Sequence, residues 1–196
     1  ASVPSVVYGL WGLYVMVPAM RDPIQIWLNT RFGALPFFAC RPLGIGMMSA
    51  VAILAIMILP YGISVGRDVL RAVPNDQREA MLALGATRWE TIWKVVVPHA
   101  RSGIVGGLLL ALGRAVGETM AVTMLIGNRS QVSSCLFSPA YTLSSQIANE
   151  FAEAVSPMHI SALMELGLVL FAITLLLNGA ARLLVWRLTR SMASRG

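Results

Sequence analysis

The chain has 196 residues, of which 57% are hydrophobic and 12% are charged, and its mean hydropathy is +0.72. Globular proteins carry about 25% charged residues, so this composition is typical of a membrane protein and argues against a soluble domain. The formal net charge is +6, but the arginines form no basic helix or tract, which argues against a nucleic-acid partner.

The first predicted element covers residues 1–20, which carry no charge and are long enough to span, or nearly span, the hydrocarbon core of a bilayer. Because the chain starts at Ala1 inside this apolar segment, we expect a fragment or a processed chain rather than a signal peptide. Residues 21–41 are predicted to form a polar loop. Residues 42–66 again carry no charge and predict a full transmembrane helix, with Pro60 kinking it near its end.

The longest polar, charge-bearing stretch follows at residues 74–98. Asp76 and Glu79 have the spacing of a capping box, in which the short side chain accepts a backbone N–H and the glutamate reaches back. Gly85 can adopt the left-handed conformation that ends a helix. We therefore predict a first short helix that ends at Gly85.

A second short helix is predicted after this glycine. Thr87 and Glu90 repeat the capping-box spacing, and Pro98 closes the stretch. The two helices share an apolar stripe, which indicates that they lie on a membrane surface rather than cross it. The stripe contains Ala80, Met81, Leu84, Trp89, Ile92 and Trp93.

Residues 101–128 are apolar except for Arg114 and Glu118, and their glycines have the GxxxG spacing that lets helices pack closely. Arg114 lies near the middle of this segment, where a charge in a membrane is costly and usually functional. The four-residue spacing places Arg114 and Glu118 on one helical face. Two interpretations stay open: the two residues form a self-neutralising structural pair, or they have a function in the membrane. We favour a function, because an arginine that precedes a glutamate is the poorer orientation for a pair.

Residues 129–153 are polar and rich in serine, with a short amphipathic helix expected at about residues 144–154. Ser156 and Pro157 then predict the N-cap and the first turn of a last helix, which ends in a basic tail. Glu165 lies near the outer start of this helix. It either shares the function of Arg114 and Glu118 or only complements the helix dipole.

Basic residues predict the orientation, because cytoplasmic loops of membrane proteins carry an excess of Lys and Arg. Ten basic residues lie on the side of the 74–98 stretch and the C-terminal tail, against four on the other side. We therefore expect the stretch and the tail to be cytoplasmic. Cys40 and Cys135 then fall on the outer side, and whether they pair is left open. His99 and His159 fall at opposite faces and cannot share a metal ion, so no metal site is expected.

The sequence contains no site for ATP of the usual kind. Lys94 is the only lysine, and it does not follow the Gly-rich loop that holds nucleotide phosphates. We therefore expect the chain not to be an enzyme, and any energy from ATP would come from a partner.

The 74–98 stretch resembles the EAA loop found in permease subunits of ABC importers, since Glu79, Ala80, Gly85 and Pro98 stand at the spacing of that loop. The departures from the family pattern are Met81, Val95 and Val97. The resemblance implies a cytoplasmic loop that docks into a groove on an ATPase subunit. Its coupling residues would be Glu79, Ala80, Gly85 and Thr87.

Residues 112–122, 148–154 and 161–167 resemble the PstC-type permeases of bacterial phosphate ABC importers, and this resemblance covers nearly the whole chain. It implies an all-α membrane protein with a MetI-like helical bundle and a single permease domain over residues 1–196. The family has six transmembrane helices. We expect about four here, the first of them partial.

The same resemblance implies the assembly in which the chain works. A homologous second permease, a dimeric ATPase that binds ATP and Mg, and an extracytoplasmic phosphate-binding protein would join it in the bacterial inner membrane. Two alternatives stay open: a permease for another oxyanion such as molybdate or sulfate, and a membrane channel or scaffold without an ATPase.

Overall fold

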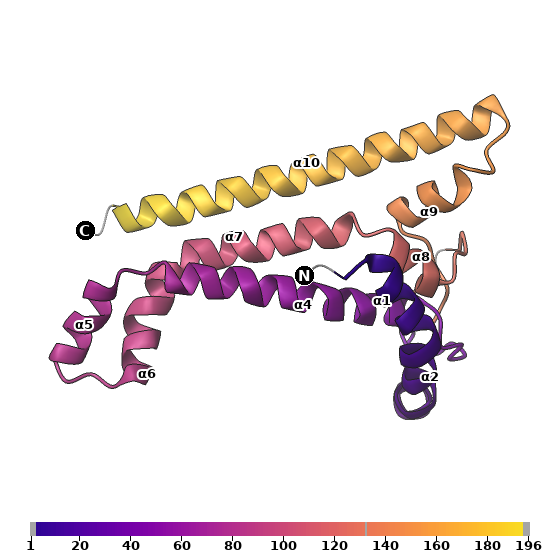
Figure 1. Ribbon diagram of the computed structural model, residues 1–196. Helices are drawn as coiled ribbons and strands as arrows, with labels where there is room; N and C mark the ends of the chain where they lie inside the picture. The colour runs from indigo at the N-terminus through magenta and orange to yellow at the C-terminus, as the bar shows by residue number, and fades with distance from the viewer. Residues whose placement is uncertain (1–2, 132, 194–196) are drawn as a thin grey trace. The chain divides into compact units, whose positions relative to one another are not determined.

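The computed structural model describes residues 3–131 and 133–193 (Figure 1). These residues form helices joined by loops, and the β-type pairing among them is limited to an isolated bridge between Gly127 and Ala140. The predicted all-α class is therefore confirmed.

The chain divides into two compact units. The first contains residues 1–57 and 115–172, and the second contains residues 58–114 and the segment after residue 172. The long helices α4 (Met47–Arg71) and α10 (Pro157–Ala193) contribute residues to both units. Each unit has its own packed side chains.

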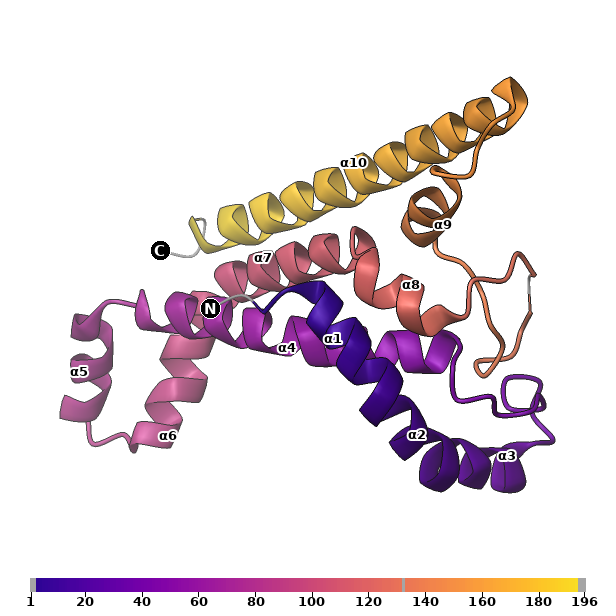
Figure 2. The same cartoon turned by 45° about the vertical axis from the view of Figure 1, so that its right-hand side comes forward.

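The first unit begins with a continuous helical run, seen at the N-terminal end of the ribbon in Figure 2. It consists of α1 (Ser5–Trp11), the π-helical turn η1 (Gly12–Met16), α2 (Val17–Met20), the π-helical turn η2 (Arg21–Gln25) and α3 (Ile26–Phe32). The prediction of a polar loop from residue 21 is therefore wrong for residues 21–32, which are helical.

The two π-helical turns explain why prolines do not end this run. A proline inside an α-helix lacks the backbone N–H and clashes with the carbonyl four residues earlier. The backbone N–H groups of Val17 and Ile26 each bond to the carbonyl five residues earlier, so the turn there is wider than an α-helical turn. The wider turns accommodate Pro18 and Pro23 inside the helix.

The core of the first unit forms where the N-terminal run, α4 and α8 (Met120–Ile126) pack together. One buried cluster contains Met16, Val17, Ile53 and Leu125, and a second contains Ala50, Val122 and Ile126. A disulfide between Cys40 and Cys135, with Cα atoms 6.2 Å apart, joins the loop before α4 to the loop after α8. The pairing that the sequence left open is therefore present.

Gln25 fixes the N-terminal run to the loop before α4. Its side chain is 1% exposed, and its amide oxygen accepts the backbone N–H of Gly44 at 3.1 Å. Its amide nitrogen donates to the Gly44 carbonyl at 3.1 Å and to the Ser49 hydroxyl at 3.3 Å. Both polar atoms of this buried amide therefore have partners, as stable burial requires.

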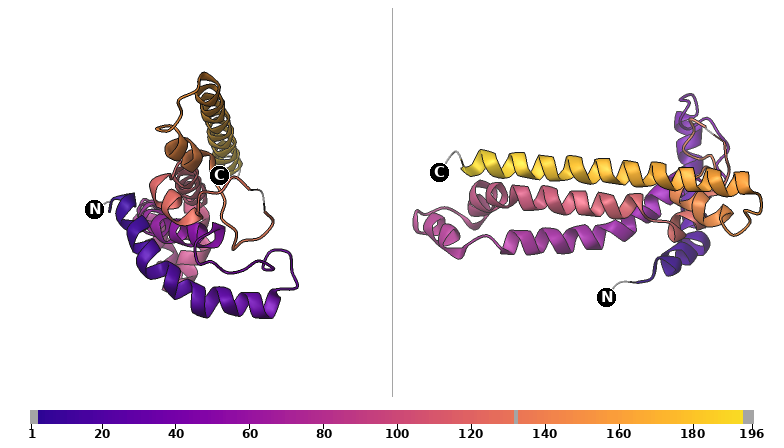
Figure 3. Two further views of the ribbon diagram at one scale, coloured as in Figure 1. Left: turned by 90° about the vertical axis from the view of Figure 1, so that its right-hand side faces the viewer. Right: turned by 90° about the horizontal axis from the view of Figure 1, so that it is seen from above.

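The second unit contains a helical hairpin and parts of three long helices. The second half of α4, α7 (Val97–Val116) and the C-terminal part of α10 run side by side, as the two panels of Figure 3 show. The hairpin consists of α5 (Asn75–Ala83) and α6 (Arg88–Thr91). The π-helical turn η3 (Ile92–Val96) then continues α6 directly into α7.

Two predicted boundaries in this unit are wrong. Pro98 does not close the coupling stretch, because the N–H of Val97 bonds to the carbonyl of Ile92 and the widened turn accommodates the proline, as in the N-terminal run. The charged residues after Gly66 do not end α4, which continues to Arg71, since basic side chains stabilise the C-terminal end of a helix dipole. Pro60 consequently lies inside α4 rather than near its end.

Three helices of the described residues are long and apolar enough to cross a membrane: Met47–Arg71, Arg88–Val116 and Pro157–Trp186. The expected span at residues 1–20 is not among them, and its helical run continues past Arg21 and Asp22 to Phe32. The expected number of about four transmembrane helices is therefore approximate.

The predicted apolar segment 101–128 is not one helix. It breaks at residues 117–119, where α7 has ended and α8 has not begun. Glycine at position 117 weakens the helix, and Glu118 bonds instead to the start of α8. The expectation that Arg114 and Glu118 share one helical face is therefore wrong, because Glu118 is outside the helix.

The predicted elements near the C-terminus are confirmed with shifted boundaries. The short helix is α9 (Leu143–Glu150), which begins with a capping box between Thr142 and Ser145. The long helix α10 begins at Pro157, and the Ser156 hydroxyl accepts the backbone N–H of His159 at 3.2 Å. The two caps stabilise the first turns of α9 and α10, and both helices begin within about one residue of the predicted start.

Replacing Gln25 with alanine should destabilise the first unit, because the buried N–H of Gly44 loses its partner. We expect Gln25→Ala to lower the free energy of unfolding by about 1–3 kcal/mol. Thermal unfolding of the detergent-solubilised protein measures this. Gln77→Ala, at an exposed position of α5, is the matched control and should change stability by less than about 0.5 kcal/mol. Equal melting temperatures for the two variants would contradict the assigned role of Gln25.

Candidate functional site

The hairpin between α5 and α6 turns at Gly85, whose φ is +83°. The N–H of Ala86 bonds to the Met81 carbonyl at 3.2 Å, and the N–H of Gly85 bonds to the Leu82 carbonyl at 3.0 Å. This pair of bonds is a Schellman motif, which satisfies the last carbonyls of α5. No atom lies within 4 Å of an added Cβ at Gly85. The backbone conformation alone therefore requires glycine, and the predicted left-handed turn is confirmed.

The second capping box of the hairpin is confirmed, and the first is wrong. The Thr87 hydroxyl accepts the N–H of Glu90 at 3.2 Å, and the Glu90 carboxylate accepts the N–H of Thr87 at 3.0 Å. At the start of α5 the N-cap is Pro74, with no side-chain cap. Asp76 lies inside the first turn, where its charge complements the helix dipole instead.

Arg78 attaches the hairpin to the end of α4. Its guanidinium donates to the carbonyl of Leu70 at 2.6 Å, and Leu70 belongs to the last turn of α4. A cation here satisfies one of the terminal carbonyls that the helix itself cannot pair. The role of Arg78 was missed from the sequence, since no spacing rule connects a residue of one helix to the end of the preceding one.

The hairpin and the turn that follows it present large apolar side chains to the outside. Leu84 is 83% exposed, Trp89 is 68% exposed and Trp93 is 56% exposed. The two indole rings contact edge to face, with centroids 5.8 Å apart. The predicted coupling residues Glu79, Ala80 and Thr87 are also exposed. Large exposed apolar side chains that lie this close in the sequence are typical of a docking site.

Arg114 lies in the last turn of α7, and its side chain is exposed. Its guanidinium carbon lies 5.8 Å from the centroid of the Tyr61 ring, a cation–π contact between α7 and α4. Tyr61 was missed from the sequence. In the sequence Tyr61 is only an aromatic residue within an apolar segment, and its partner Arg114 lies more than 50 residues later.

Glu118 lies in the break between α7 and α8. Its carboxylate accepts the N–H of Ala121 at 3.4 Å, and its carbonyl accepts the Ser144 hydroxyl at 3.1 Å. The carboxylate is therefore next to the N-terminal end of α8, where a negative charge is stabilised. Glu118 and Glu165 belong to the first unit, and Arg114 belongs to the second. Glu165 lies on α10, and its side chain is exposed.

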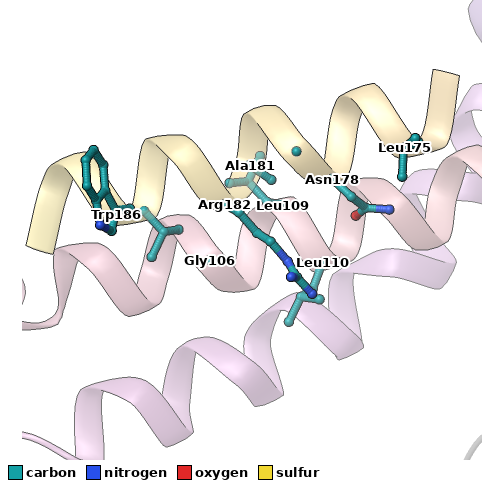
Figure 4. Close-up of a pocket in the computed structure, with 10 residues that line it drawn as sticks. Gly106, Leu109, Leu110, Leu175, Asn178, Ala181, Arg182 and Trp186 are labelled. Atoms are coloured by element: carbon teal, nitrogen blue, oxygen red, sulfur yellow. The ribbon is translucent and has the colours of Figure 1, made fainter. Parts of the chain in front are cut away.

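A groove of about 1050 Å³ lies between α7 and α10 in the second unit (Figure 4). Leucine, alanine and glycine residues form most of its lining. Asn178 and Arg182 project into it from α10, as Figure 4 shows. Asn178 also lies 3.7 Å from the position of an added Cβ at Gly113. Nothing in the sequence pattern singled out Asn178, although it is a polar residue inside a long apolar stretch.

A smaller pocket of about 410 Å³ lies in the first unit, beside the disulfide. It is more polar, with Arg129, Tyr141 and Gln146 among its lining residues. The His159 ring and the Glu150 carboxylate lie within hydrogen-bond distance, with 3.2 Å between Nε2 and the carboxylate oxygen, and connect the end of α9 to the start of α10. In the described part of the chain, no group of three or more His, Cys, Asp or Glu side chains could hold a metal ion.

Comparison with known proteins finds a family model and relatives that are all named as membrane components of transport systems. Residues 1–190 match the family model of the binding-protein-dependent transport system inner membrane component. The phosphate transport system permease protein PstC of Pasteurella multocida is 48% identical over 194 residues, which are 97% of this chain and 60% of the relative. The protein of the same name from Mesorhizobium japonicum is 46% identical over 192 residues, 96% of this chain and 59% of the relative.

A relative with lower sequence identity has a similar name. The probable phosphate transport system permease protein PstC of Methanocaldococcus jannaschii is 42% identical over 191 residues, 95% of this chain and 60% of the relative. The chain thus spans about 60% of the length of the curated relatives it matches. No solved structure matches it.

Proposed function

The chain belongs to the family of binding-protein-dependent transport system inner membrane components, and we propose that it is the permease subunit of an ATP-driven importer of inorganic phosphate. The observation that carries this proposal is the similarity to proteins named phosphate transport permeases, which reaches 48% identity over 97% of this chain. Because the chain spans about 60% of these relatives, the activity proposed is that of the full-length protein.

The hairpin of α5 and α6 is the proposed contact with the ATPase. Its exposed apolar side chains, Leu84, Trp89 and Trp93, would be buried by a partner, and aromatic anchors of this kind dominate binding energy at interfaces. The Schellman motif at Gly85 and the capping box at Thr87 give the hairpin a fixed shape. A rigid hairpin can transmit a displacement of the partner, whereas a flexible loop would absorb it.

The helix that starts in the hairpin connects it to the proposed anion path. Residues 88–116 form one continuous helix through α6, η3 and α7. At 1.5 Å per residue, Trp89 and Arg114 are roughly 37 Å apart along its axis. A movement of the hairpin would therefore displace Arg114 directly, which is how we propose that hydrolysis of ATP by the partner changes access to the anion.

Arg114 supplies the charge for the anion in this proposal. A guanidinium has a planar set of donors suited to phosphate oxygens and stays charged when it is desolvated. Transport also requires that the anion leaves, so a carboxylate on the path would weaken its binding. We assign this role to Glu118, which follows Arg114 by four residues in the sequence, and we keep Glu165 as a second acidic residue of the path.

The proposed assembly contains a homologous second permease, a dimeric ATPase that binds ATP and Mg, and an extracytoplasmic phosphate-binding protein. The hairpin and the C-terminal end would be cytoplasmic, in the inner membrane of a bacterium. The disulfide supports this orientation, because such bonds persist on the oxidising, outer side of that membrane.

Labelling of single cysteines tests the orientation. Both native cysteines are in the disulfide, so an impermeant maleimide should react only with an introduced thiol. Gln77→Cys in α5 should react from the cytoplasmic side alone. Ala152→Cys, at an exposed position between α9 and α10, should react from the outside alone. The reverse pattern would overturn the orientation and the proposed contact with the ATPase.

Substitution of Gly85 tests the coupling. Valine cannot adopt a positive φ without a cost of about 1–2 kcal/mol, so Gly85→Val should distort the hairpin. We expect the ATPase to dissociate, or its hydrolysis to continue without uptake, while the permease still inserts into the membrane. Gly85→Asn is the matched control, because asparagine adopts this conformation more readily. Normal coupled transport by Gly85→Val would show that the hairpin is an ordinary surface loop.

Substitution of Arg114 tests the anion path and the substrate. Phosphate uptake is measured in liposomes that contain the assembled complex, with sulfate and molybdate as competitors. Arg114→Gln should abolish uptake while the complex still assembles, and Arg114→Lys should restore it only in part, because an ammonium lacks the planar donors. Glu118→Gln should bind the anion more tightly or discriminate less. Near-normal uptake with Arg114→Gln would contradict the assigned path, and transport of sulfate or molybdate in preference to phosphate would contradict the assigned substrate.

A further inference from the structure

The packing of α4 on α7 in the second unit is unusually close. An added Cβ at Gly107 would lie 2.7 Å from the Val65 side chain, and one at Gly103 would overlap Val69. Only residues without a side chain allow the two backbones to approach in this way. The relative position of the two helices is therefore fixed along this contact.

Tyr61 belongs to the same face of α4. Its position is four residues before Val65, which is four residues before Val69, and this spacing places the three side chains in one row. On α7 the opposing row continues from Gly107 to Ala111, which is 4% exposed, and ends near Arg114. The Tyr61 ring is thus carried by the packed face of α4 to within 5.8 Å of the Arg114 guanidinium carbon.

The chemistry of this contact differs from that of an ion pair. A carboxylate beside Arg114 would accept its N–H donors and neutralise its charge. An aromatic ring attracts the cation through its quadrupole and leaves the N–H donors unused. The ring therefore restrains the guanidinium while the cation stays available to an incoming anion.

We propose that Tyr61 is a positioning residue for the transported oxyanion, holding the Arg114 guanidinium by a cation–π contact so that its N–H donors face the anion. This inference rests on the proposed function of Arg114. Loss of the ring leaves Arg114 free to adopt other rotamers, and the transport rate falls because fewer complexes present the donors correctly.

The experiment uses the full-length permease in its assembled complex in liposomes, with phosphate uptake as the readout. Tyr61→Phe keeps the ring and should retain uptake within about twofold. Tyr61→Leu removes the ring and should lower uptake about 3- to 30-fold. Tyr14→Leu, at a tyrosine that is 74% exposed in the first unit, is the matched control and should leave uptake unchanged.

A second series separates the cation–π contact from simple packing. Phenylalanines with one, two and three ring fluorines are incorporated at position 61, because each fluorine weakens the ring quadrupole and barely changes its size. Uptake should fall stepwise along the series, while co-purification of the subunits and ATP hydrolysis without substrate stay constant. A flat series, or normal uptake with Tyr61→Leu, would overturn the proposal.

These outcomes are distinguishable from a failure of the proposed function. If the wild-type complex transports sulfate or molybdate in place of phosphate, the assigned substrate is wrong, and the same series with the transported anion decides the role of Tyr61. If Arg114→Gln transports normally, the assigned path fails and the positioning role fails with it. If Arg114→Gln is inactive and the fluorine series is flat, only the role of Tyr61 is wrong.

Discussion

Inside a bilayer, every backbone N–H and C=O must find a partner within the protein, because the hydrocarbon offers none. Three places where this chain departs from a regular α-helix meet that requirement. The π-helical turns before Pro98 and Pro18 keep the helices continuous where a proline would otherwise break them. At the one break between α7 and α8, the carboxylate of Glu118 accepts a backbone N–H, and the hydroxyl of Ser144 donates to a backbone carbonyl.

The continuity gained in this way determines how the second unit can work. A helix that passed from the hairpin into the membrane with a hinge at Pro98 would bend there under load. In the proposed function the uninterrupted helix transmits the displacement instead, and the close contact of Gly103 and Gly107 with α4 makes the two helices move together. Displacements at one end are thereby shared by two helices, including the part of α4 that carries Tyr61.

The features that could be predicted from the sequence depend on short-range rules. Gly85, the Thr87 cap and the start of α10 at Pro157 each follow from residues within one or two turns of each other. The wrong predictions came from residues with strong local signals that longer-range structure overrides. The polar residues after position 20 indicated a loop, but the helix continues to Phe32 and Gln25 is buried against Gly44. The contacts of Arg78 and Tyr61 could not be predicted from the sequence. Their partners, the Leu70 carbonyl and Arg114, depend on how separate helices pack.

The disulfide has a consequence for biogenesis. Cys40 and Cys135 are 95 residues apart in the sequence, and the segment between them contains α4, the hairpin, α7 and α8. In the proposed orientation both thiols must reach the outer side before they can be oxidised, so the ribosome and the insertion machinery have to deliver this whole segment first. Covalent closure therefore marks completed insertion of these helices, and a chain arrested earlier would carry a free Cys40 thiol.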